Sequence, residues 1–107
     1  MTINAEYFEN ALKTRHASDV EKELIDRSSE RVEIWAKPGA DPNAFEAFTG
    51  FYKVGDDAWV CHDNERGSNS FTDMDEAKAR SQADFWANQS GVRSVSRVNG
   101  KGQGVNQ

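Results

Sequence analysis

The chain has 107 residues, of which 29% are charged and 36% hydrophobic, with six Phe, three Trp and two Tyr. This length and composition predict one folded domain with its own core and exclude a disordered chain. The single cysteine, Cys61, excludes an internal disulfide. No apolar stretch reaches the length of a membrane span or a signal-peptide core, so we expect a cytoplasmic protein.

The charge is divided unevenly along the chain, whose net charge is −5. Residues 1–76 carry eight Lys or Arg against seventeen Asp or Glu, whereas residues 77–107 carry five against one. Proteins that grip a phosphate backbone usually have the opposite overall sign, because Lys and Arg supply most of that affinity. An acidic surface attracts basic partners instead, or simply keeps a small protein soluble.

The first 28 residues have helical periodicity. Tyr7, Phe8 and Leu12 lie at helical spacing within residues 4–15 and predict an amphipathic helix. Ser18 and Glu21 have the spacing of a capping box and predict that a second helix starts there. One continuous helix to about residue 28 is the alternative.

Short β-branched and aromatic runs predict the strands of a sheet. The expected strands are residues 31–36, 51–54, 58–62, 70–72 and 92–98. The turn at Gly55, Asp56 and Asp57 joins the second and third of these as a hairpin. Residues 43–48, with Phe45 and Phe48, fit either a helical turn or the beginning of the second strand. The residues of the last strand are small, polar or basic, which is typical of a strand at the edge of a sheet.

A third helix is expected from about Asp73 to Gln89. Thr72 or Asp73 would cap it, and Glu76 lies at capping-box spacing. Its apolar stripe is expected to include Phe85, and Gly91 stops it. We divide the chain into a domain of residues 1–98 and a flexible tail of residues 99–107.

These elements predict an α+β fold. The sheet should be small and mainly antiparallel, with four to five strands, and the N-terminal helix or helices and the helix at about 73–90 should pack on one face. The other face would be exposed and would carry whichever of Trp35, Tyr52 and Trp59 do not point into the core.

Cys61, His62 and Asp63 bring a thiol, an imidazole and a carboxylate together in sequence, which suggests a cysteine nucleophile. Strand geometry argues against this reading, because successive side chains point to opposite faces. The only other histidine is His16. We expect a buried Cys61, a surface His62, and no enzymatic activity or cofactor.

Metal binding is not expected either. Two histidines and one cysteine lack a known ligand spacing, and the run from Asp63 to Gly67 falls short of a calcium loop. The carboxylates of Asp73, Asp75 and Glu76 are explained by a helix N-terminus.

Four other carboxylates are candidates for binding a partner. Asp56 and Asp57 precede one expected strand, and Asp63 and Glu65 follow it, so they should form two acidic points about 17 Å apart. The full set of expected partner-binding residues is Asp56, Asp57, Asp63, Glu65, Trp35, Tyr52 and Trp59. A flat basic surface could meet both acidic points.

Aromatic residues close to basic side chains, as in Trp35-Ala36-Lys37 and Phe51-Tyr52-Lys53, suggest an alternative function as a small nucleic-acid-binding or regulatory domain. It would use the sheet face and the basic C-terminal segment. Nearby Glu33, Asp56 and Asp57 would repel a phosphate backbone.

The chain resembles the small acidic proteins with which phages and mobile elements oppose host defence, of the anti-CRISPR or anti-restriction type. The resemblance is one of size, charge and general organisation. It rests on a short N-terminal helix, a Gly-Asp-Asp-Ala-Trp-Val hairpin over 55–60, an Asp-Met-Asp-Glu-Ala-Lys-Ala-Arg segment over 73–80, and one cysteine. It implies a stoichiometric inhibitor without a cofactor, bound to a basic protein or nucleoprotein complex in a bacterial cytoplasm. A structural or assembly role, and a homodimer through the exposed face, remain open.

Overall fold

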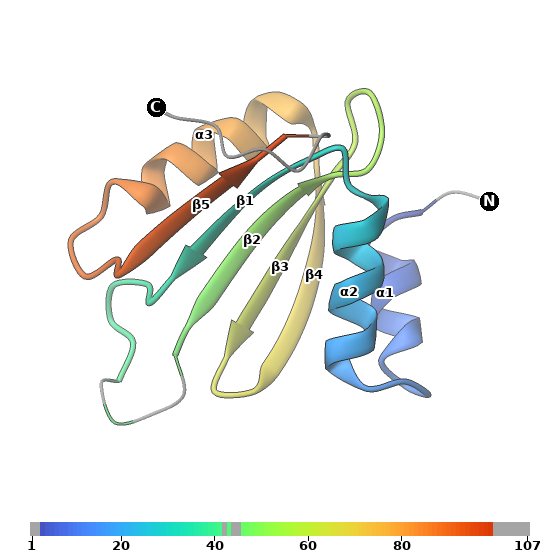
Figure 1. Ribbon diagram of the computed structural model, residues 1–107, viewed down its shortest axis with the longest axis horizontal. Coiled ribbons are helices and arrows are strands. Elements are labelled where there is room, and N and C mark those ends of the chain that lie inside the picture. Colours follow the sequence, from blue (N-terminus) through green and yellow to red (C-terminus); the bar gives the residue numbers. More distant parts are fainter. Residues whose placement is uncertain (1–2, 42, 44–45, 100–107) are drawn as a thin grey trace.

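The computed structural model describes residues 3–41, 43 and 46–99 (Figure 1). The helices are α1 (Ala5–Ala11), α2 (Ala17–Arg27) and α3 (Glu76–Ala87). The strands are β1 (Glu30–Trp35), β2 (Phe48–Lys53), β3 (Trp59–Glu65), β4 (Ser68–Met74) and β5 (Ser94–Val98). The expected tail from residue 100 onward and Phe45 lie outside the described residues.

The strands form one sheet in the order β4-β3-β2-β1-β5, and all four pairings are antiparallel. This arrangement confirms the predicted α+β class and the antiparallel sheet. The last strand lies at an edge, as its composition indicates. The strand β1 pairs with both β2 and β5, so the C-terminal strand lies beside the first strand of the chain.

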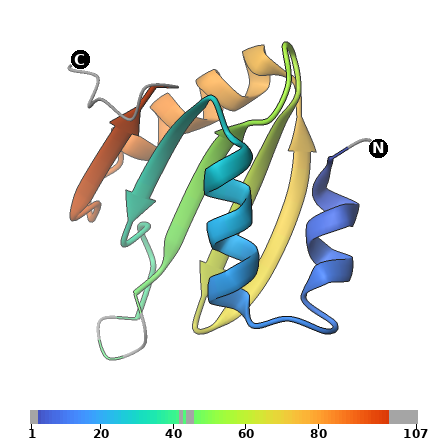
Figure 2. The ribbon, with the colours of Figure 1, turned by 45° about the vertical axis from the view of Figure 1, so that its right-hand side comes forward.

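Both faces of the sheet are covered, which corrects the expectation that all helices lie on one face (Figure 2). Alternation along the strands gives two apolar clusters. The cluster under α1 and α2 contains Phe8, Val20, Leu24, Phe48, Tyr52, Val60 and Phe71. The cluster under α3 contains Val32, Ile34, Phe51, Trp59, Cys61, Ala79 and Ala83. Because both faces present large apolar side chains, each face needs its own helical layer.

The N-terminal region forms two helices, which decides between the two readings left open by the sequence. Asn4 caps α1 through a bond from the Tyr7 amide, whereas His16 and not Ser18 is the N-cap residue of α2. The predicted capping box is therefore wrong by two residues. The two helices are joined by Glu23, which accepts bonds from Tyr7 Oη at 2.6 Å and Arg15 Nη1 at 2.5 Å.

The predicted start of α3 is also wrong. The strand β4 continues to Met74, because Asp73 pairs with Val60 and Met74 with Trp59. Asp75 is the N-cap residue instead, and its Oδ1 accepts a bond from the Lys78 amide at 2.7 Å. Several polar residues in this stretch could cap a helix, and pairing with β3 decides which of them is used.

Candidate functional site

The ion pairs divide the acidic residues into two groups. Almost every base is neutralised within the domain: among the described residues, only Lys13 and Lys78 have no ion pair. Within the same residues, the acids without an ion pair are Glu6, Glu9, Asp19, Glu21, Asp56, Asp57, Glu65, Asp73 and Asp75. The uncompensated charge of the surface is therefore predominantly negative.

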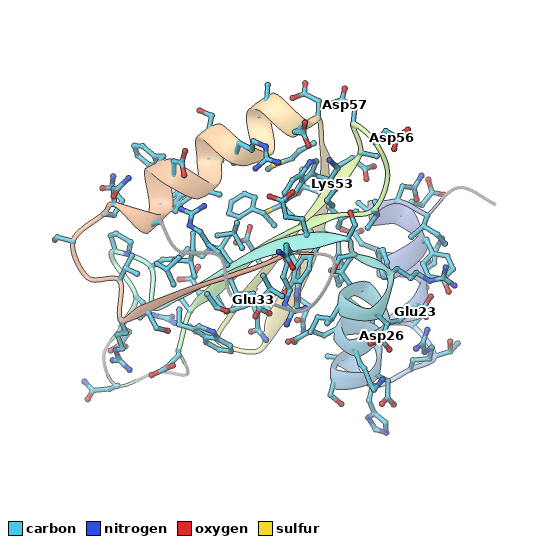
Figure 3. The ribbon with its side chains drawn as sticks, turned by 45° about the horizontal axis from the view of Figure 1, so that its top comes forward. Glu23, Asp26, Glu33, Lys53, Asp56 and Asp57 are labelled. Atoms are coloured by element: carbon cyan, nitrogen blue, oxygen red, sulfur yellow. The ribbon has the colours of Figure 1, made fainter. Side chains whose placement is uncertain are left out.

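Five of these unpaired acids gather at one end of the sheet. They come from the first turn of α1, the β2–β3 turn, the end of β4 and the N-cap of α3. We call this group the acidic rim; its members are Glu6, Asp56, Asp57, Asp73 and Asp75. All five are exposed. Figure 3 shows Asp56 and Asp57 at the tip of the turn, beside the beginning of α3.

Hydrogen bonds fix three of the rim carboxylates in place. Oδ1 of Asp57 accepts from the Glu76 amide at 2.9 Å, and Oδ1 of Asp73 accepts from the Ala5 amide at 2.8 Å. Oδ1 of Asp75 accepts from the Lys78 amide. Each of these bonds leaves the second carboxylate oxygen available, so the rim is ordered by the backbone of α1 and α3 and still presents acceptors to a partner.

A shallow hollow of about 350 Å³ lies within the rim. Asp57, Asp73 and Asp75 line it, and its lining also includes Val54 and Met74. None of the described residues that line it is a cation. Apolar side chains beside three carboxylates suit the aliphatic stem and charged head of a lysine or arginine side chain.

Glu76 is next to the rim and does not belong to it. Lys53 Nζ lies 2.7 Å from Glu76 Oε1, and this hydrogen bond holds the pKa of Glu76 below its usual value. Arg80 forms two bonds to Glu30, at 2.9 and 3.0 Å. These bases neutralise the acidic side chains on the side of α3 that faces β1, so Glu76 does not add to the unpaired charge of the rim.

The other predicted acidic point is largely compensated. Asp63 and Glu65 lie at the end of β3 and not in a loop, because the β3–β4 pairing extends to Glu65 and Ser68. Oδ1 of Asp63 bonds Lys37 Nζ at 2.5 Å and Thr49 Oγ1 at 2.6 Å. The two predicted acidic points are thus unequal.

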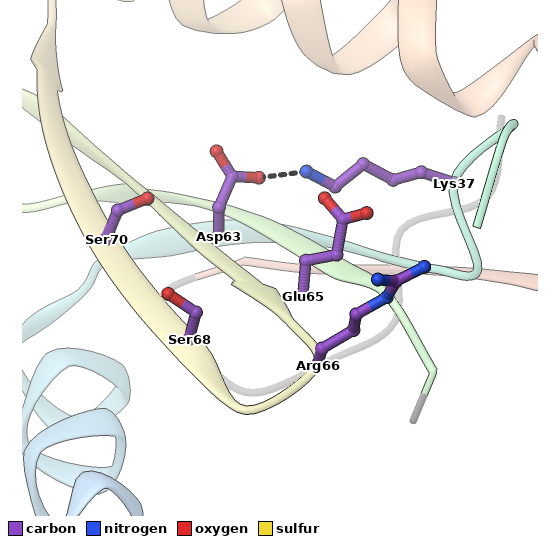
Figure 4. A pocket seen from close by; sticks show the side chains of 6 residues that line it. All are labelled: Lys37, Asp63, Glu65, Arg66, Ser68 and Ser70. Atoms are coloured by element: carbon purple, nitrogen blue, oxygen red, sulfur yellow. Dashed lines mark hydrogen bonds and ion pairs between the residues drawn. The ribbon is translucent and has the colours of Figure 1, made fainter. Parts of the chain in front are cut away.

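Figure 4 shows the hollow of about 550 Å³ at this end of the sheet. It is lined by Lys37, Asp63, Glu65, Arg66, Ser68 and Ser70. Two cations accompany two carboxylates in this lining, so the hollow has no net charge and lacks the electrostatic bias of the rim.

Of the three aromatic residues expected at a binding face, the structure leaves one at the surface. Tyr52 is fully buried and donates to Glu33 Oε2 at 3.0 Å, and Trp59 is buried under α3. The expectation that these two contact a partner is therefore wrong, because helices cover both faces of the sheet. Trp35 is 37% exposed and packs on Phe48, with ring centroids 4.5 Å apart.

Cys61 and His62 point to opposite faces, as strand alternation requires. Burial raises the pKa of the Cys61 thiol to about 12, with a further contribution from Asp63, which is the opposite of an activated nucleophile. His62 is 1% exposed, so the expected surface position is wrong. It stacks on Phe71 at 4.6 Å, and its Nε2 pairs with Asn69 Oδ1 at 2.8 Å.

Metal ligands do not cluster in the part of the chain that the structure describes. No group of three or more His, Cys, Asp or Glu there could hold a metal ion. No helix within the same residues is long and apolar enough to cross a membrane.

Sequence reasoning identified Asp56 and Asp57 but missed the other three rim residues. The sequence explains Asp73 and Asp75 by the N-terminus of a helix, and Glu6 lies within the predicted helix of residues 4–15. The missing information is tertiary: the Ala5 amide bonds Asp73, 68 residues away, and this contact brings α1 to the end of β4. The one available signal was the acid-rich run 73–76 beside an acidic turn.

No protein-family model, curated protein or solved structure matches the chain significantly.

Proposed function

We propose that the protein is a non-enzymatic binding module whose acidic rim engages a basic surface of another macromolecule. The partner class that fits is a protein or nucleoprotein complex that handles nucleic acid, because such machinery presents Lys and Arg surfaces to phosphate. Occupying that surface would make the module a stoichiometric inhibitor, of the kind that phages and mobile elements use against host defence.

The observation that carries the proposal is the segregation of unpaired charge. All described bases except Lys13 and Lys78 form internal ion pairs, while five exposed carboxylates without an ion pair lie at one end of the sheet. Three of them are held by backbone amides and line one hollow. These bonds also cap the first turns of α1 and α3, and because each uses one carboxylate oxygen, the second oxygen is held at the surface, where a partner can reach it.

The nucleic-acid alternative has less support. Arg80, Arg93 and Arg97 belong to the basic part of the chain, and each forms an ion pair with an acidic side chain of the domain. Binding phosphate would require breaking these pairs. Two aromatic residues next to lysines, Trp35 and Tyr52, were the candidates for stacking on nucleobases. Tyr52 is buried and cannot do so.

A comparative capture experiment tests the proposal. The bait is the full chain in three forms: wild type, a rim variant and a control variant, each incubated with lysate of the native host and analysed by mass spectrometry. The rim variant is Glu6→Lys with Asp56→Lys. The control is Asp19→Lys with Glu65→Lys, two exposed and unpaired acids away from the rim.

The two variants are matched in design. Each changes the net charge by the same amount, and each alters one acid in the first turn of a helix and one at the end of a hairpin. We expect wild type and control to recover the same nucleic-acid-handling protein and the rim variant to lose it. Equal recovery by all three forms, or recovery of nucleic acid without protein, would contradict the proposal.

A further inference from the structure

A histidine is buried beside the apolar cluster under α1 and α2. The His62 ring stacks on Phe71 at 4.6 Å and lies edge-on to Phe48 at 5.5 Å. Phe71 stacks in turn on Phe8 of α1, with ring centroids 5.6 Å apart. One aromatic ring therefore separates the imidazole from α1.

The hydrogen bonds of Asn69 assign the tautomer of this imidazole. Asn69 Nδ2 donates to the Gly67 carbonyl oxygen at 3.3 Å, so Oδ1 is the atom that faces His62. This oxygen can only accept, and His62 Nε2, which lies 2.8 Å away, must carry the hydrogen. A neutral imidazole has one N–H group, so Nδ1 is the nitrogen that can take up a proton.

The Nδ1 atom of His62 is buried and has no hydrogen-bond partner. A proton there would add an N–H donor without an acceptor, and it would place a positive charge among aromatic rings. Both are unfavourable in the folded chain, because a buried charge needs a partner that bonds it. Water satisfies both, so the proton favours a conformation in which the imidazole is exposed.

The titratable groups on the elements around His62 are engaged with other groups. They are Tyr7 and Glu9 of α1, Glu23 of α2, Tyr52 of β2 and Asp73 of β4. Glu9 accepts from the Phe71 amide and Asp73 from the Ala5 amide. The Tyr7 hydroxyl donates to Glu23, and the Tyr52 hydroxyl donates to Glu33. None of these groups bonds Nδ1 of His62.

The helix α1 is the layer over His62 that can open locally. It has seven residues, which is too short for a helix that is stable by itself. Its hydrogen bonds run to β4 at the Ala5 and Phe71 amides and to α2 through Tyr7, and the Phe8 ring completes the contact. A short segment held by a few contacts opens before the whole domain unfolds. Releasing α1 uncovers Phe71 and the site of His62 beneath it.

We propose that His62 is an acid-sensitive switch that controls the docking of α1 on β4. At neutral pH the uncharged imidazole packs between Phe48 and Phe71, and α1 stays in place. As the pH falls through about 6.5, where a histidine in water is protonated, the open form takes up a proton that the closed form cannot accommodate. The docking of α1 is therefore strongest above this range and weakens below it.

The same opening changes the acidic rim. Glu6 belongs to α1, and the Ala5 amide holds the Asp73 carboxylate in place. Opening α1 moves Glu6 away from the other rim residues and releases Asp73, so acid would weaken contact with a partner. This consequence rests on the proposed function. The switch itself does not, and it is tested without a partner.

Hydrogen exchange of the full chain at about pH 7.5 and about pH 5.5 tests the switch, with each rate corrected for the intrinsic effect of pH. The Phe71 amide is the reporter, because it donates to Glu9 of α1 and is released when α1 opens. If only the open form takes up the proton, its opening equilibrium should rise about tenfold between these two pH values.

The chain contains two histidines, so two variants separate their effects. His62→Phe keeps a ring beside Phe71 and cannot take up a proton, and we expect a change of less than about twofold. His16→Gln is the matched control, because His16 is exposed and makes no capping bond with its side chain. It should keep the tenfold change. Circular dichroism checks that each variant is folded, and His62→Gln replaces His62→Phe if the latter does not fold.

A rise that His16→Gln retains and His62→Phe abolishes would support the switch. The proposal is overturned if wild type changes by less than about twofold, if His62→Phe changes as much as wild type, or if His16→Gln removes the effect. The outcome is independent of the capture experiment, because no partner is present.

Discussion

Gly50→Ala probes the tightest contact in the sheet. A Cβ atom at Gly50 would lie 2.4 Å from Cε1 of Tyr52 and 2.6 Å from its hydroxyl oxygen. Tyr52 is fully buried and hydrogen-bonded to Glu33, so the ring cannot yield without leaving its site. The glycine is therefore required by the position of a neighbouring side chain on the same strand face.

The cost follows from two terms. Overpacking a close-packed core costs about 1 to 3 kcal/mol, and losing a hydrogen bond to a charged group costs about 1.5 to 3 kcal/mol. We expect Gly50→Ala to lower the free energy of unfolding by about 3 kcal/mol. Urea unfolding followed by circular dichroism measures this change, and Tm should fall by about 10 to 20 °C.

A double-mutant cycle identifies the cause. Tyr52→Leu removes the ring, so in that background Gly50→Ala should cost less than about 1 kcal/mol. A loss below about 1 kcal/mol for Gly50→Ala alone would refute the reasoning. An unchanged cost in the Tyr52→Leu background would show that the ring is not the obstacle.

Three further predictions concern ionisable groups and a cap. Hydrogen bonds from Tyr7 and then Arg15 lower the pKa of Glu23 to about 2, so the stability it supplies is present above pH 4.5 and is lost as pH falls toward 2. Glu23→Gln should reduce the change in the free energy of unfolding between pH 4.5 and 2 by about 1 kcal/mol, a value discounted for solvent screening. Identical acid-unfolding curves for wild type and Glu23→Gln would contradict this. Because burial raises the pKa of Cys61, its thiol should resist iodoacetamide at about pH 8 until urea unfolds the chain, and rapid labelling of the native protein would show that the site is open. Asp75→Ala removes the cap of α3 and should cost about 1 kcal/mol in urea unfolding, with Asp75→Asn as the control that retains most of it.

The elements of the fold could be predicted from local patterns, but some of their ends could not. Alternating β-branched residues indicated β1, and Gly55 with its acidic neighbours indicated the β2–β3 turn. The ends of β4 and α3 depended on competition: Asp73 can cap a helix, yet it pairs with Val60 and bonds the Ala5 amide instead. Such a choice is made by partners distant in sequence.

The covering of both faces of the sheet could have been predicted from the strands themselves. Tyr52 and Trp59 belong to strands on which both faces carry large apolar residues, a pattern that indicates a sheet buried on both sides. The prediction of one exposed face placed these aromatic residues at a binding surface, and the burial of Tyr52 and Trp59 removes both from the expected contact residues. Of the three, only Trp35, at the end of β1, remains at the surface.

Only part of the candidate site could be predicted, because some of its features depend on contacts between residues distant in sequence. Asp56 and Asp57 were recognised in the turn, because turn residues are solvated. The compensation of Asp63 by Lys37 joins residues 26 apart in sequence, and nothing local to either one indicates it. The internal pairing of bases, and not the net charge of −5, distinguishes the rim from the rest of the surface.

The most direct test of the acidic rim is a calorimetric titration of the captured partner with wild type, the rim variant (Glu6→Lys with Asp56→Lys) and the control (Asp19→Lys with Glu65→Lys), at low and moderate salt. Exposed ion pairs contribute about 0.2 to 1 kcal/mol each, and reversal adds repulsion, so the rim variant should bind about tenfold more weakly at low salt, with a flatter salt dependence. The control should match wild type within about twofold. Equal weakening of both variants would mean that only net charge matters, and unchanged binding by the rim variant would contradict a role for the rim.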